Sequence, residues 1–95
     1  MSHPMGIGKA IRLVRKARGL TQEDFSEVSS RTYLSSLERD LKSPTLDKLM
    51  QLANVAGVHP ATLIAVSMLP TLNESRVDAL LSLLERELRG LVSGD

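Results

Sequence analysis

The fold is decided by residues 15–45, whose sequence is RKARGLTQEDFSEVSSRTYLSSLERDLKSPT. A basic amphipathic segment at the start leads into Gly19, which suits the left-handed conformation that ends a helix. Thr21 has the hydroxyl and the acidic neighbours expected of an N-cap, so a second short helix is predicted to begin there. A pair of serines at 29–30 interrupts it, and a third helix is predicted over residues 31–39. Two short helices are therefore expected on either side of a tight turn.

The remaining helices are predicted from apolar residues that recur every three or four positions. This spacing indicates helices over residues 6–18, 45–57, 60–70 and 73–91. No segment has the pattern of a strand, so we expect an all-α fold with five helices and an additional C-terminal helix. Pro70 and Thr71 mark a hinge, which divides the chain into a domain of residues 1–70 and a C-terminal element of residues 71–95.

The composition fits a small helical domain with an aliphatic core. Of the 95 residues 42% are hydrophobic, but Phe25 and Tyr33 are the only aromatic ones. Leu, Val, Ile, Ala and Met must therefore fill the core, and we expect Met50, Ile64 and Met68 to pack there. A chain this short buries a small fraction of its surface, so association is one way to gain stability.

Several classes of protein are disfavoured by what the sequence lacks. It has no cysteine and no apolar run near the roughly 20 residues that span a bilayer. His3 and His59 lack a cluster of further ligands, so neither a metal nor a cofactor is expected. Met1–Pro4 lacks the basic and apolar regions of an export signal, so we expect a cytoplasmic protein without membrane contact. With no Gly-rich phosphate loop and no convergent Ser/His/Asp set, an enzyme is the least favoured class.

Positive charge is concentrated in the half that contains the two short helices. Residues 1–48 carry nine Lys or Arg and six Asp or Glu, whereas residues 49–95 carry three and five. A basic surface attracts DNA phosphates, and a short helix that follows a tight turn can enter the major groove. The pattern therefore predicts DNA binding. Four further cations fit a solvated helix face as well as they fit phosphate contacts: Lys9, Arg12, Lys16 and Arg18.

The helices also carry a series of motifs in a fixed order. These are Arg12-x-x-Arg15-x-x-x-Gly19-Leu20-Thr21-Gln22, Tyr33-Leu34-Ser35-x-Leu37-Glu38-Arg39, Ser43-Pro44-Thr45-Leu46, Leu49-x-x-Leu52-Ala53 and Gly57-Val58. Over residues 6–66 they resemble the Cro/CI-type, or XRE, family of helix-turn-helix regulators. The resemblance implies a lambda-repressor-like five-helix DNA-binding domain, and residues 71–95 lie outside it.

The resemblance assigns DNA contacts to nine residues. In the third helix, Arg31, Thr32 and Ser36 take the groove-facing positions, and Arg31 is expected to make the strongest base contact because Arg can bond O6 and N7 of guanine. Gln22 would bond a phosphate and brace this helix. The full predicted set is Gln22, Ser30, Arg31, Thr32, Tyr33, Ser36, Arg39, Lys42 and Ser43.

The resemblance also implies one ion pair, and the sequence differs from the family pattern at two places. Arg15 and Glu38 match a partly buried salt bridge of the family, and we interpret them as structural. The family commonly has a longer turn with a glycine before its third helix. Residues 27–31 make this crossing without glycine, so either the turn is tighter or the second helix ends early. Asp40 stands where glycine commonly follows the third helix, and Asp tolerates the left-handed conformation.

The C-terminal helix carries an apolar stripe. Its members are spaced alternately by four and three residues, as in a coiled-coil seam, with one more leucine beside them: Val77, Leu80, Leu81, Leu84, Leu88 and Leu91. The stripe could fold back over the helices of residues 6–18 and 60–70, or pair with its copy in a dimer. We favour dimerisation, because the first five helices should already close a core.

The combined prediction is a homodimeric, sequence-specific transcriptional regulator that binds an inverted-repeat operator in double-stranded DNA, in the simplest case as a repressor. Two alternatives remain open. An antitoxin or restriction-modification controller protein would autoregulate its operon, with residues 71–95 available to a protein partner. A helical protein-interaction module would no longer contact DNA.

Overall fold

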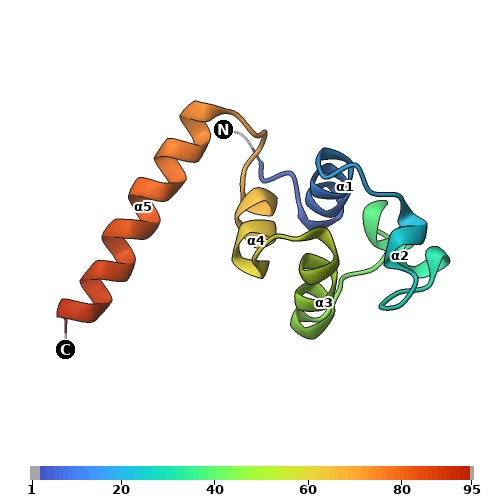
Figure 1. Ribbon diagram of the computed structural model, residues 1–95. Helices are drawn as coiled ribbons and strands as arrows, with labels where there is room; N and C mark the ends of the chain where they lie inside the picture. The colour runs from blue at the N-terminus through green and yellow to red at the C-terminus, as the bar shows by residue number, and fades with distance from the viewer. Residues whose placement is uncertain (1–2, 95) are drawn as a thin grey trace.

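The computed structural model describes residues 3–94, which form helices and connecting turns but no strand. In chain order the elements are α1 (Ile7–Ala17), the 3₁₀ turn η1 (Gln22–Phe25), α2 (Arg31–Glu38), α3 (Leu46–Ala56), α4 (Pro60–Met68) and α5 (Glu74–Ser93) (Figure 1). The predicted all-α class is confirmed. The predicted domain of residues 1–70 and the C-terminal element of residues 71–95 include residues 1, 2 and 95, which lie outside the described residues.

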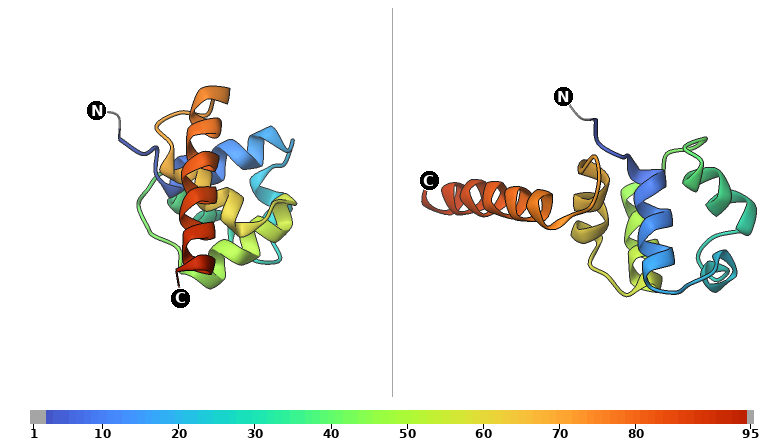
Figure 2. Two further views of the ribbon diagram at one scale, coloured as in Figure 1. Left: turned by 90° about the vertical axis from the view of Figure 1, so that its left-hand side faces the viewer. Right: turned by 90° about the horizontal axis from the view of Figure 1, so that it is seen from above.

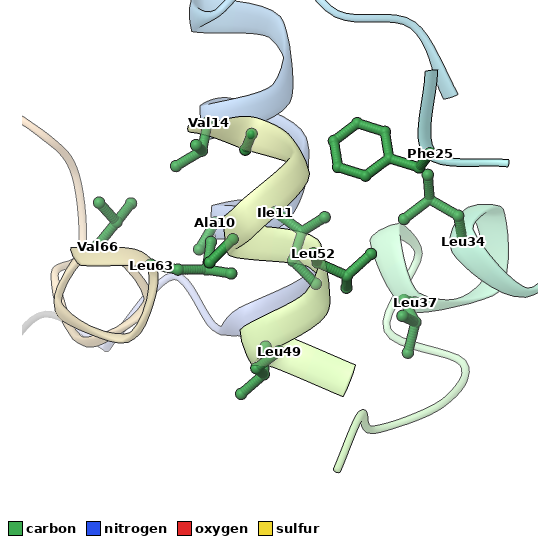
Figure 3. Close-up of a cluster of buried hydrophobic side chains, with 12 residues drawn as sticks. Ala10, Ile11, Val14, Phe25, Leu34, Leu37, Leu49, Leu52, Leu63 and Val66 are labelled. Atoms are coloured by element: carbon green, nitrogen blue, oxygen red, sulfur yellow. The ribbon is translucent and has the colours of Figure 1, made fainter. Parts of the chain in front are cut away.

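Helices α1 to α4 and η1 enclose one core, in which eleven aliphatic side chains pack with the ring of Phe25 (Figure 3). Phe25 and Leu52 are each 1% exposed, and Leu34 and Leu37 are fully buried. The cluster is completed by Ala10, Ile11 and Val14 of α1, Leu49, Ala53 and Ala56 of α3, and Leu63 and Val66 of α4. Full burial of one such large side chain stabilises a fold by about 1.5–3 kcal/mol. This core therefore holds α1 to α4 together as one unit.

Polar side chains cap the helix starts. Ser30 Oγ accepts a hydrogen bond from the backbone N–H of Tyr33 at 3.1 Å, and Thr45 caps α3 in the same way. At η1 the hydroxyl of Thr21 belongs to a complete capping box. His59 caps α4 through Nδ1, a role that the sequence did not indicate. Each cap satisfies a backbone donor that the helix itself leaves unpaired.

The second helix is shorter than the sequence predicts. It consists of one 3₁₀ turn, and the chain continues in turns over residues 26–28 before α2 begins. The carbonyl of buried Phe25 accepts hydrogen bonds from the N–H groups of Val28 and Ser29, both at 3.0 Å. These bonds turn the chain directly after η1. The shortened crossing without glycine is thus accommodated by the early end of the helix.

Three apolar side chains expected in the core lie at the surface. Met50 is 50% exposed, Met68 is 58% exposed and Ile64 is 37% exposed. Ile64 and Met68 lie four residues apart, so they share one face of α4, whereas Leu63 on the neighbouring face is buried. An apolar residue at helical spacing is thus no proof of burial within the same chain.

The start of α1 meets the end of α2 at a glycine. A Cβ atom on Gly8 would stand 2.4 Å from the carbonyl oxygen of Leu37 and from Oδ1 of Asp40. Asp40 has the left-handed conformation expected of it, with φ of 60°. Its Oδ1 accepts a hydrogen bond from the N–H of Gly8 at 3.2 Å. Asp40 therefore both turns the chain and ties the end of α2 to α1.

Helix α5 stands apart from the α1–α4 core (Figures 1 and 2). It begins at the N-cap Asn73, whose Oδ1 accepts a hydrogen bond from the backbone N–H of Arg76 at 2.9 Å. The helix contains no buried residue. Folding back over α1 and α4, one of the two arrangements considered for the apolar stripe, is therefore not what this structure shows.

Residues 3–94 contain neither a single membrane-spanning helix nor a metal-binding cluster. Taken singly, no helix there has both the length and the apolar content of a membrane span. Only α3 and α4 combined reach these values, across a bend of 105°, and both contribute side chains to the core. The same residues bring together no group of three or more His, Cys, Asp or Glu side chains that could hold a metal ion.

Replacing Gly8 with alanine should lower the free energy of unfolding by about 1–3 kcal/mol, because the added Cβ overlaps the backbone of Leu37. Urea unfolding followed by circular dichroism measures the change. Gly90→Ala is the matched control: no atom lies within 4 Å of its added Cβ, and alanine is the better helix former. Unchanged stability of Gly8→Ala would contradict the close approach of α1 and α2.

Candidate nucleic-acid interface

The outward face of α2 and the start of η1 form one shallow groove. Its volume is about 350 Å³, and it is lined by Gln22, Arg31, Thr32, Ser35 and Arg39. The α2 members recur at the three- and four-residue spacing that places side chains on one helix face. All five are polar and two are cations. Such a face can contact a polar, anionic surface.

The orientation of this face depends on an ion pair between α1 and α2. Arg15 Nε donates to Glu38 Oε2 at 2.7 Å, and Arg15 Nη2 donates to Glu38 Oε1 at 2.8 Å. The two side chains are only 10% and 4% exposed. The hydrogen bonds to Glu38 raise the pKa of Arg15, although burial acts in the opposite direction, so the guanidinium stays charged. The pair joins the last turn of α1 to the last residue of α2.

Two further hydrogen bonds tie the chain around η1 to this pair. Gln22 Nε2 donates to Glu38 Oε1 at 3.2 Å, and Arg15 Nη1 donates to the carbonyl of Leu20 at 3.1 Å. Gln22 therefore contacts the last turn of α2 and also lines the groove. The Glu38 carboxylate thus accepts hydrogen bonds from Arg15 of α1 and from Gln22 of η1.

Four residues of the predicted DNA-contact set lie at the start of α2 and in the loop after it: Ser30, Tyr33, Lys42 and Ser43. Ser30 Oγ caps α2 as an acceptor, so its hydroxyl hydrogen remains available to donate. The half-buried ring of Tyr33 has Lys42 Nζ at 5.6 Å and Lys48 Nζ at 5.8 Å from its centre, both within cation–π range. Lys42 and Ser43 are exposed. Tyr33 thereby links α2 to the loop that follows it.

Three residues outside the predicted set lie at or beside the groove. Ser35 and Ser36 are both half-buried, but only Ser35 belongs to the groove lining, whereas Ser36 was the residue predicted to face the groove. Arg12 and Lys16 of α1 line a second hollow of about 270 Å³, which shares three of its lining residues with the groove. The four-residue spacing between Arg31 and Ser35 is the sequence signal that could have identified Ser35.

The other two cations of the predicted α1 segment have different surroundings. Arg18 Nε donates to the carbonyl of Ala56 at 3.0 Å, which ties the end of α1 to the end of α3. Lys9 is exposed and lines a hollow beside the linker that leads to α5, to which Arg12 and Lys16 also contribute. The structure therefore groups Arg12 and Lys16, but neither Arg18 nor Lys9, with the groove-lining residues.

Comparison with known proteins gives matches to the same part of the chain. A protein-family model described as helix-turn-helix matches residues 11–63. An immunity repressor protein of Bacillus phage phi105 is 36% identical over 62 residues, which cover 63% of this chain and 43% of the phage protein. An uncharacterized HTH-type transcriptional regulator, y4dJ, of Sinorhizobium fredii (strain NBRC 101917 / NGR234) is 40% identical over 60 residues, or 61% of this chain and 78% of that protein. The match thus spans less than half of the phage protein, and no solved structure matches the chain significantly.

Either Arg15→Met or Glu38→Met should lower the free energy of unfolding by about 3–5 kcal/mol, because the remaining buried charge loses its partner. The double variant should recover most of this loss, which a double-mutant cycle by urea unfolding measures. Arg89→Met is the control: Arg89 pairs with Glu85 at 2.9 Å on the exposed surface of α5, so its loss should cost less than about 1 kcal/mol. Additive losses at Arg15 and Glu38 would show that the pair is not coupled.

Proposed function

This chain belongs to the helix-turn-helix family, as its resemblance to Cro/CI-type proteins predicts, and on this premise we propose that it is a sequence-specific transcriptional regulator of double-stranded DNA. The observation that carries the proposal is the groove on α2. It offers five polar side chains on one outward face, and an ion pair with α1 fixes the helix behind it. A helix held in this way can enter a major groove with its side chains already oriented.

Base contacts are assigned to the groove face. Arg31 and Arg39 are exposed cations at its two ends, and either can bond O6 and N7 of a guanine. Thr32 presents a methyl group and a hydroxyl, which suit a thymine methyl group and a polar base edge. Ser35 also lines the groove, and Ser36 follows it in the sequence. We expect Arg31 to contribute most to the choice of sequence.

Phosphate contacts are assigned to the residues around this face. Ser30, Tyr33, Lys42 and Ser43 lie at the start of α2 and in the following loop, and Gln22 lies at the start of η1. Contacts of this kind position a protein on the duplex but do not distinguish sequences. Arg12 and Lys16 extend the basic surface along α1.

The regulator is proposed to act as a homodimer through the stripe on α5. Leu81, Leu84, Leu88 and Leu91 are 59%, 37%, 61% and 72% exposed, whereas Val77 and Leu80 are half-buried. A two-fold dimer would place two α2 helices in successive major grooves about 34 Å apart and would recognise an inverted repeat. The residues assigned to dimerisation are Val77, Leu80, Leu81, Leu84, Leu88 and Leu91.

Repression is the proposed mode of regulation. A dimer bound over a promoter excludes other proteins from that DNA without needing a catalytic group or an effector domain. The name of the phage relative, an immunity repressor, supports this mode. We expect the protein to act on bacterial or phage DNA in the cytoplasm.

Selection from a pool of random duplexes tests the function. The protein should enrich a sequence with two similar half-sites in inverted orientation, and its affinity for that sequence should fall steeply as salt is raised. Failure to enrich any sequence over competitor DNA would contradict a regulator and favour a helical protein-interaction module. Co-purification of a second protein with the operator-binding chain would instead indicate an antitoxin or controller protein.

Arg31→Ala should weaken binding to the selected operator, because it removes a bidentate contact worth about 1–3 kcal/mol. This loss corresponds to roughly 5- to 150-fold in Kd. Arg86→Ala is the matched control, since it removes the same charge from an exposed position on α5. Fluorescence anisotropy at constant salt measures both affinities. An unchanged affinity of Arg31→Ala in a folded protein would show that this face does not contact bases.

A further inference from the structure

The chain exposes more surface than a compact monomer of its size. Its accessible area is 6575 Å², whereas a folded monomer of 10.4 kDa is expected to expose about 5,400 Å². Its radius of gyration is 14.5 Å, against about 12 Å for a compact domain of this length. The excess area is larger than the roughly 800 Å² that each partner buries in a standard interface. Helix α5, which has no buried residue, accounts for the elongated shape (Figure 2).

The apolar stripe of α5 is nearly symmetric in sequence about Leu84. Leu84 lies near the middle of the 20-residue helix. Val77 and Leu91 stand seven residues before and after it, and Leu80 and Leu88 stand four before and after it. An antiparallel copy centred on Leu84 therefore places Leu88 opposite Leu80 and Leu91 opposite Val77. In this register five of the six members of the stripe meet an apolar residue, whereas Leu81 lies opposite Glu87.

A second apolar surface faces the first half of α5. Helix α4 contains no charged residue, and its outer face carries the exposed Ile64 and Met68. With Leu80 and Leu84 of α5 these side chains line a cleft of about 260 Å³ between the two helices. Figure 1 shows α5 leaving the linker at an angle to α4. The last half of α5 has no such neighbour: the hollow along it is lined by α5 residues alone.

We propose that the α4–α5 cleft of each chain is filled by the last half of α5 from a second copy of this chain. This inference rests on the proposed homodimer and specifies its architecture. The two α5 helices pair antiparallel, so Leu88 and Leu91 of the second copy enter the cleft and contact Ile64 and Met68. The symmetric contact is made at the other end of the pair.

The position of the free half of α5 favours the antiparallel arrangement over a parallel one. The first half of each α5 is already flanked by its own α4, so in a parallel pair the two α4 helices would compete for the same space. The last half is unaccompanied and can enter the cleft. Antiparallel pairing brings this half to the cleft of the other chain. It also covers Ile64 and Met68, which a pairing of α5 with α5 alone would leave in water.

Disulfide trapping tests the architecture, because the chain has no cysteine of its own. Ile64→Cys and Leu88→Cys chains are mixed, oxidised under mild conditions and analysed by non-reducing gels and mass spectrometry of the linked peptides. We expect a disulfide between the two different chains. Leu84→Cys alone should also form a covalent dimer, since the two copies of residue 84 face each other. Leu88→Cys alone should not, because its two copies lie about 12 Å apart along the helices, beyond disulfide reach.

Other outcomes would overturn the proposal in distinguishable ways. Efficient linkage of Leu88→Cys with itself would indicate a parallel pair. An intrachain disulfide in the Ile64→Cys/Leu88→Cys double variant, with no linkage between chains, would indicate that α5 folds back on its own α4. No linkage with any variant would show that α5 does not pair. Operator binding is measured separately on the wild-type chain, so the architecture can fail while the proposed function stands.

Discussion

The ion pair between Arg15 and Glu38 is the contact on which the proposed interface depends. Helix α2 has only eight residues, too few to be stable alone, so its position is set by what holds it. Leu34 and Leu37 anchor it in the core, but apolar contacts have little directional preference. The bidentate pair fixes the rotation of α2 about its own axis. That rotation decides which side chains of residues 31–39 face outward.

The groove and the apolar stripe lie on different parts of the chain. The α1–α4 core carries the groove. Polar contacts hold α2 at both ends: the Ser30 cap at its start and the hydrogen bond from the N–H of Gly8 to Asp40 at its end. Helix α5 contributes nothing to this core and leaves its apolar stripe exposed. The proposed DNA contact and the proposed chain association use different surfaces, so substitutions are expected to change one without the other.

The sequence predicts the helices well because their signals are local. N-caps such as Thr21 and Thr45 and the three- and four-residue apolar spacing act within a few residues of the helix they define. The early end of the second helix was one of two alternatives that the short crossing at residues 27–31 left open. The choice between them depends on the hydrogen bonds to the carbonyl of buried Phe25, which the sequence does not show. Burial of Met68 was wrongly predicted because periodicity marks an apolar face but not what covers it. Ser35 lines the groove but was not in the predicted set, because the sequence alone does not give the rotation of α2 that decides between neighbouring positions.

The most direct measurement is a map of backbone amide shifts by NMR, with isotope-labelled protein titrated with the operator duplex obtained by selection. If the outward face of α2 contacts DNA, the largest changes will fall on Gln22, on residues 30–39 and on the following loop. The amides of α5 will change little, because they lie on a different surface. Changes confined to α5, or spread evenly over the chain, would contradict the assignment of DNA contact to α2.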